Sequence, residues 1–97
     1  MEVRFRTRQL ARAYEQSGEA ARRWGPTVGA RYVQRVDLLQ EAKQLVDLFA
    51  IRALALHPLV GGRRGQYALR LTGQQRLVLT VEGEAAVTVE EVVDYHG

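Results

Sequence analysis

The chain of 97 residues contains no cysteine, which excludes a disulfide framework, a thiolate metal site and a cysteine nucleophile. With only two histidines, a structural zinc ion would need carboxylates to complete its shell, so we expect neither a metal nor another cofactor. No apolar run approaches the length of a membrane span, and residues 1–6 lack the apolar core of a signal peptide. We therefore expect a cytoplasmic protein that does not enter a membrane.

Lysine is almost absent as well. Thirteen of the fourteen basic side chains are arginine, and only Lys43 is lysine. A GC-rich genome produces the same bias, but the planar guanidinium also suits phosphate recognition. Residues 1–81 hold all fourteen basic groups and six acidic ones, whereas residues 82–97 hold five acidic groups and no basic one. This basic body is consistent with a polyanionic partner without identifying one.

The length and the spacing of apolar residues predict one domain over residues 1–97. A short strand is expected at residues 3–5, where apolar and charged residues alternate. Thr7 is suited to cap a helix that runs to about Trp24. Gly25 and Pro26 then end that helix and start a second one that runs to about residue 48. The two helices are expected to form a hairpin.

The second half of the chain predicts the sheet on which this hairpin packs. Strands are expected at residues 66–72, 75–81 and 85–93, with turn signals at 72–73 and 82–84. Residues 51–56 are expected to supply another extended piece before Pro58. The predicted order is β-α-α-β-β-β, an α+β domain in which an antiparallel sheet carries the helical hairpin on one face.

Alternation along these strands predicts which side chains avoid the helices. If the leucines and valines at alternate positions form the core, the open face receives four polar side chains: Arg70, Arg76, Asp94 and His96. The same parity places Tyr67 and Tyr95 on the buried side. A bulge near Glu91 would reverse Tyr95.

These residue types suit the cleavage of RNA without a metal. That reaction needs a group that accepts the 2′-hydroxyl proton, a group that protonates the departing 5′-oxygen, and positive charge near the phosphorane. The candidates for proton handling and orientation are His57, Asp94, Tyr95 and His96, and the candidate charges are Arg63, Arg64 and Arg76. A 2′-hydroxyl is present only in RNA, so this mechanism would spare DNA.

Each candidate also has an ordinary structural interpretation. A lone histidine before proline is often a turn residue that caps the backbone, and residues 94–97 are equally typical of a frayed end. Arg63 and Arg64 lie between glycines and suit a solvated loop as well as a phosphate-binding one. A salt bridge to a partner explains Arg70 as well as RNA does.

Three spaced motifs carry a resemblance to a known family. Leu56-His57-Pro58-Leu59 is followed by the basic glycine loop of residues 61–65, then by Arg76-Leu77-Val78-Leu79, and finally by Asp94-Tyr95-His96. This order resembles the HigB-type toxins of the RelE/ParE superfamily, which implies a RelE-like fold. The resemblance further implies that the cleavage site is lined by His57, Arg76, Asp94, Tyr95 and His96. Val60 stands where this family usually has a lysine, and Gln74-Gln75 stands where it tends to have an asparagine and an aromatic residue.

The resemblance also implies a function and partners. HigB-type toxins are ribosome-dependent mRNA endonucleases of type II toxin–antitoxin systems, which enter the ribosomal A site and cleave mRNA there. The implied partners are the ribosome, mRNA and a cognate antitoxin, in this family typically a HigA-like helix-turn-helix protein. Two alternatives remain: a ParE-type toxin that poisons DNA gyrase, against which His57 and His96 argue, and a catalytically inactive interaction module, which Val60 leaves open.

Overall fold

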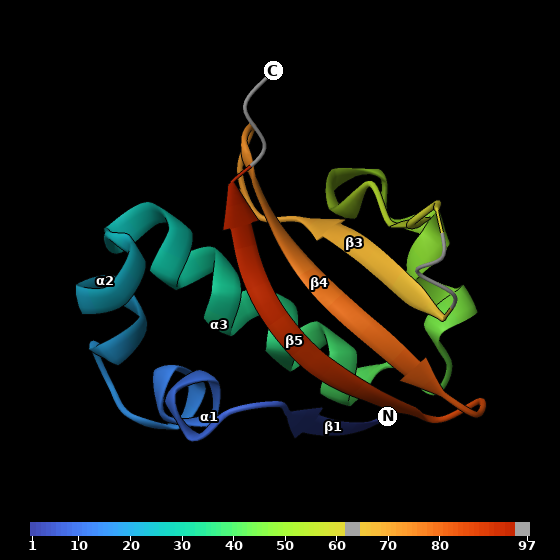
Figure 1. The fold of residues 1–97 in the computed structure, drawn as a ribbon, viewed down its shortest axis with the longest axis horizontal. Coiled ribbons are helices and arrows are strands. Elements are labelled where there is room, and N and C mark those ends of the chain that lie inside the picture. The colour runs from blue at the N-terminus through green and yellow to red at the C-terminus, as the bar shows by residue number, and fades with distance from the viewer. Residues whose placement is uncertain (62–64, 95–97) are drawn as a thin grey trace.

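The computed structural model describes residues 1–61 and 65–94. Three α-helices pack against a sheet of five strands. Figure 1 shows how these elements are arranged in space. Two short 3₁₀ helices, η1 and η2, connect the last α-helix to the second strand. The elements in chain order are β1 Glu2–Phe5, α1 Arg8–Glu15, α2 Glu19–Trp24, α3 Pro26–Glu41, η1 Leu45–Ala50, η2 Arg52–Leu54, β2 His57–Pro58, β3 Gln66–Arg70, β4 Gln75–Glu82 and β5 Ala86–Asp94.

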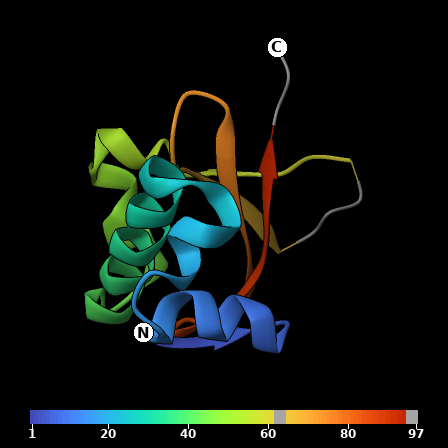
Figure 2. The ribbon, with the colours of Figure 1, turned by 90° about the vertical axis from the view of Figure 1, so that its left-hand side faces the viewer.

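The sheet has the strand order β1-β5-β4-β3-β2. Strands β2 to β5 pair antiparallel, whereas β1 pairs in parallel with β5, so the sheet is mixed. Figure 2 shows the helices on one side of the sheet, with the other side uncovered by helices. The predicted α+β class with helices on one face is confirmed. We call the side away from the helices the open face.

The first predicted helix is two helices. Thr7 caps α1 as expected, because its Oγ1 accepts a hydrogen bond from the Leu10 amide at 3.2 Å. The helix ends at Glu15, and Gly18 then adopts a left-handed conformation with a φ of 81° before α2 begins. The break at Gly25 and the start of α3 at Pro26 are confirmed.

The region after α3 differs from the sequence prediction. The helix stops at Glu41 rather than near residue 48, and the next apolar residues lie in the 3₁₀ helix η1. Leu45 and Leu48 are buried there, since a spacing of three suits a 3₁₀ turn as well as an α-helix. The prediction of an extended segment at residues 51–56 is wrong, because residues 52–54 form η2 and Ala55 adopts a left-handed conformation.

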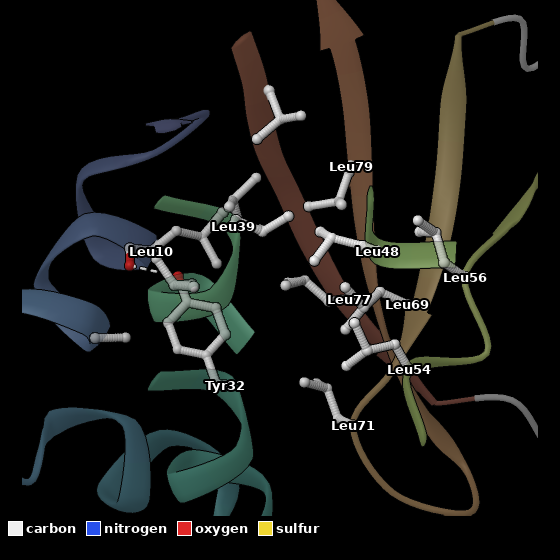
Figure 3. Close-up of a cluster of buried hydrophobic side chains, with 14 of the residues drawn as sticks. Leu10, Tyr32, Leu39, Leu48, Leu54, Leu56, Leu69, Leu71, Leu77 and Leu79 are labelled. Carbon is white, nitrogen blue, oxygen red and sulfur yellow. Dashed lines mark hydrogen bonds between the residues drawn. The ribbon is translucent and has the colours of Figure 1, made fainter. Parts of the chain in front are cut away.

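The core lies between the helices and one face of the sheet (Figure 3). Its sheet side is formed by the leucines and valines that the alternation predicted: Leu69, Leu71, Leu77, Leu79, Val87 and Val89. Tyr32 is buried on the helix side and donates its hydroxyl to the Leu10 carbonyl at 2.7 Å. Trp24 packs against Tyr32 with ring centroids 4.6 Å apart. Both aromatic residues therefore belong to the packing of the fold.

In the ranges that the structure describes, no helix is long and apolar enough to cross a bilayer.

Candidate functional site

The open face carries the candidate residues in two rows that run across the strands. One row joins His57 on β2, Ala68 on β3, Val78 on β4 and Glu91 on β5. The second row joins Arg70 on β3 with its partners on β4 and β5. Because these rows are two residues apart along β3 on the same face, the Cα atoms of His57 and Arg70 are roughly 8 Å apart.

His57 lies at the edge of the sheet with its side chain exposed. Its Nδ1 is 2.9 Å from the carbonyl oxygen of Ala55, a residue in the left-handed conformation with a φ of 45°. Since a carbonyl only accepts, Nδ1–H is the donor, and the second ring nitrogen is left to exchange a proton. The imidazole is therefore oriented by the backbone in a manner that suits an acid or a base.

Arg70 and Arg76 face each other across the β3–β4 pair. Arg70 is exposed on the open face, as predicted. Arg76 is half-buried, and its Nη1 donates to the carbonyl oxygens of Thr72 at 2.7 Å, Gly73 at 3.2 Å and Gln75 at 3.0 Å. Arg76 therefore clamps the β3–β4 turn while it keeps its charge at the end of the open face.

The predicted orientation of Asp94 is wrong. The register shifts between Val78 and Leu79, so that these residues pair with Glu91 and Val89 and leave Glu90 as the extra residue of a bulge. Beyond the bulge the parity of β5 is reversed, and Val93 rather than Asp94 pairs with Arg76.

Asp94 instead pairs with Gln75, on the helix side of the sheet. It is exposed there and lines a hollow of about 160 Å³ together with Trp24 and Val28. Asp94 and Arg76 therefore leave the sheet on opposite faces.

Glu90 lies on the open face, where alternation with Val87 and Val89 also places it, and the bulge brings Glu91 to the same face, opposite Val78. Glu90 accepts a hydrogen bond from the Thr80 hydroxyl at 2.8 Å and forms an ion pair with Arg6 at 3.4 Å. Thr80 in turn accepts from the Gln66 amide at 3.2 Å. Glu90 therefore lies at the β1 side of this face in an ion pair with Arg6, whereas Arg70 and Arg76 lie toward the β3–β4 turn.

Sequence reasoning also missed two arginines of α3. Arg35 donates its Nε to the Arg70 carbonyl at 3.1 Å, and Arg31 donates Nη1 to the Leu71 carbonyl at 3.1 Å. Arg35 is buried, and burial, together with the nearby charge of Arg31, lowers the pKa of its guanidinium. A pair of arginines four residues apart on the apolar stripe of a helix is the signal that could have identified them.

The remaining predicted residues have two outcomes. Arg63, Arg64, Tyr95 and His96 lie outside the described residues. Val60 is described and is 85% exposed, on the segment that follows β2 and leads away from the helices (Figure 2). Residue 60 is thus accessible to solvent and to a ligand. Within residues 1–61 and 65–94, no three His, Asp or Glu side chains converge to hold a metal ion.

No family model and no curated protein matches the sequence. Solved structures do match it over nearly its full length. A mutant of YafQ from E. coli has a TM-score of 0.64 at 14% identity, over 96% of this chain and 91% of that one. The YoeB/ParE toxin from Agrobacterium tumefaciens has a TM-score of 0.52 at 20% identity, over 100% of both chains. The YoeB–YefM complex from Staphylococcus aureus gives 0.54 at 19% identity, over 100% and 98%. The chain therefore shares the fold of these proteins, some of which were solved in toxin–antitoxin complexes.

Proposed function

We propose that this chain is the toxin of a type II toxin–antitoxin pair and cleaves mRNA in the ribosomal A site. The observation that carries the proposal is the placement of an exposed, backbone-oriented imidazole, His57, on the same face as Arg70 and Arg76. Its fold is that of YafQ and YoeB. The motif order shared with HigB-type toxins supports the finer assignment to that subtype.

The reaction we propose needs no group from outside the chain and its RNA. The 2′-oxygen forms a bond to the adjacent phosphorus, and the bond from phosphorus to the 5′-oxygen breaks. His57 takes the proton of the 2′-hydroxyl or delivers one to the departing 5′-oxygen, and His96 is the proposed complement. Arg76 stabilises the charge that develops on the phosphorane, with Arg63 and Arg64 as further cations. The products are a 2′,3′-cyclic phosphate and a 5′-hydroxyl.

The orientation of Asp94 changes its proposed role. Because Asp94 leaves the sheet on the side opposite to Arg76, we propose that it positions the end of β5 rather than touching the reacting phosphate. Tyr95 keeps its proposed place in the site from the resemblance.

An antitoxin is the proposed protein partner. The solved YoeB–YefM and DinJ–YafQ complexes pair proteins of this fold with such a partner. The HigA-like helix-turn-helix type is proposed from the resemblance to HigB toxins. Co-purification with the product of an adjacent reading frame tests this part separately.

The decisive experiment is induced expression followed by mapping of RNA 5′ ends. We expect growth arrest and new cuts inside coding regions, in frame with codons, and cleavage of a programmed ribosome by the purified protein. His57→Ala and His96→Ala should each remove at least about two orders of magnitude of the rate. Intact messages with trapped gyrase–DNA adducts would instead identify a ParE-type toxin. Normal growth would identify an inactive module.

A further inference from the structure

Three arginines bind consecutive carbonyl oxygens at the end of β3, those of residues 70–72. Arg35 donates to the first at 3.1 Å, Arg31 to the second at 3.1 Å, and Arg76 to the third at 2.7 Å. Two of these side chains come from α3 and one from β4, so guanidinium groups converge on the β3–β4 turn from both sides of the sheet. We call this set, with Arg70, the turn arginine cluster: Arg31, Arg35, Arg70 and Arg76.

The contacts within the turn arginine cluster leave its charge uncompensated, because carbonyl oxygens are neutral. In the described part of the chain, every ion pair involves Arg4, Arg6 or Arg22, and none involves the cluster. Residues 62–64 and 95–97 include no Asp or Glu. The four positive charges of the cluster therefore have no carboxylate side chain of this protein within ion-pair distance.

This arrangement is costly for the fold. Arg35 is only 5% exposed, and a buried charge without a counter-ion is destabilising. Arg31 and Arg35 are like charges four residues apart on one helix, and Arg70 and Arg76 are like charges directly opposite in a sheet. Local conflicts of this kind are expected at functional sites. An anion bound at the cluster would compensate this charge.

We propose that the turn arginine cluster binds a phosphate of the RNA backbone beside the cleaved linkage, with Arg31 as its contact on the helix side. Arg31 and Arg70 are both exposed, one from the helix side and one on the open face, so RNA can pass around the end of the sheet. The planar fork of arginine suits a phosphate bound by several donors. This inference rests on the proposed function, because it extends the path of the same RNA.

The test measures the binding of a short single-stranded oligoribonucleotide to the full chain as a function of salt. Arg31→Gln should reduce the slope of log K against log salt concentration by about 0.7, the contribution of one phosphate contact on a single strand. Arg31→Lys should restore most of the slope because it keeps the charge. Arg12→Gln is the matched control, because this exposed arginine lies on α1, far from the turn (Figure 1).

Equal slopes for Arg31→Gln and Arg12→Gln would overturn the proposal, and a lower melting temperature for Arg31→Gln would then assign the arginine a purely structural role. If the cluster instead binds an acidic protein segment, Arg31→Gln would leave the salt slope of RNA binding unchanged, which would also overturn the proposal. The outcome is separable from the proposed function. If Arg31→Gln lowers the salt slope but the protein cleaves no mRNA, only the phosphate site is supported. If the protein cleaves mRNA and Arg31→Gln leaves the slope unchanged, only the nuclease function is supported.

Discussion

Arg70 and Arg76 are direct cross-strand partners, and no carboxylate in the described part of the chain pairs with either. Like charges directly opposite in a sheet oppose folding by an amount within the range of about 0.2–1 kcal/mol that such pairs contribute. The fold tolerates this repulsion at the end of the face where we place the RNA. Binding of a phosphate between the two guanidinium groups would relieve it.

Arg70→Gln should therefore weaken function without weakening the fold. We expect the free energy of unfolding to stay unchanged or to rise by up to about 0.5 kcal/mol, because the repulsion is removed. Affinity for the oligoribonucleotide at low salt should fall. Urea unfolding and salt-dependent binding provide the two measurements. A variant that loses stability and keeps its affinity would show that Arg70 only supports the hairpin.

His57→Gln separates chemistry from structure at the edge of the sheet. The side chain is exposed, so the free energy of unfolding should change by no more than about 0.5 kcal/mol. The cleavage rate should fall by about 10²–10⁴-fold, because glutamine can donate to the Ala55 carbonyl but cannot exchange a proton. Cleavage of a programmed ribosome is compared with thermal unfolding. Unchanged cleavage would remove His57 from the site.

Val60→Lys should raise the rate if the missing family lysine has cost the site a cation. Residue 60 is 85% exposed, so a lysine fits without strain and without a change in stability. One charge placed near the developing oxyanion is worth about 2–4 kcal/mol. An unchanged rate would indicate that Arg63 or Arg64 already supplies the charge. The double replacement of those arginines by alanine should then abolish cleavage.

Gly29→Ala should destabilise the fold although alanine is the better helix former. A Cβ at Gly29 would lie 2.6 Å from the backbone nitrogen of Ala21, so α2 and α3 would have to separate. Overpacking of this kind costs about 1–3 kcal/mol. Gly73→Ala is the control, since nothing lies within 4 Å of its added Cβ. Equal denaturation midpoints for the two variants would contradict the prediction.

The stability of the protein should fall in alkaline solution. A hydrogen bond to Asp37, then burial, raises the pKa of Tyr14 from 10.0 to about 12. A raised pKa in the folded state gives stability that is fully present below pH 10 and is lost as the pH rises toward 12. Tyr14→Phe removes this group, so its unfolding free energy should fall less steeply over that interval. Identical slopes for the variant and the parent would refute this assignment.

Local patterns predicted much of the fold. The alternation of leucines with Arg70 and Arg76 correctly predicted these strands and which of their side chains face the core. This alternation depends only on neighbouring residues in the sequence. The capping of α1 by Thr7 and the break at Gly25 have equally local causes. His57 was selected from its motif and residue type; it lies in the short strand β2 at the edge of the sheet, and its role stays a prediction.

The parts that failed depend on contacts between distant residues. The bulge at Glu90 arises from the pairing of β5 with β4, and it turned Asp94 to the opposite face from the one predicted. The parallel attachment of β1 joins the two ends of the described chain. Arg31 and Arg35 acquire their place only when α3 lies against the end of β3. No spacing within the sequence contains this information.

The extra residue at Glu90 also bears on how sequences of this fold can be recombined. A terminal segment transplanted from a relative whose last strand has no such insertion would present its side chains to the wrong layer of the molecule. Deletion of Glu90 alone would instead remove the extra residue, so Glu91 would still pair with Val78 and Val92 would keep its place in the core. The face on which residues 91–94 lie therefore depends on how many residues precede them in β5, and an alignment of this region must place one gap correctly before a role is transferred to any of them.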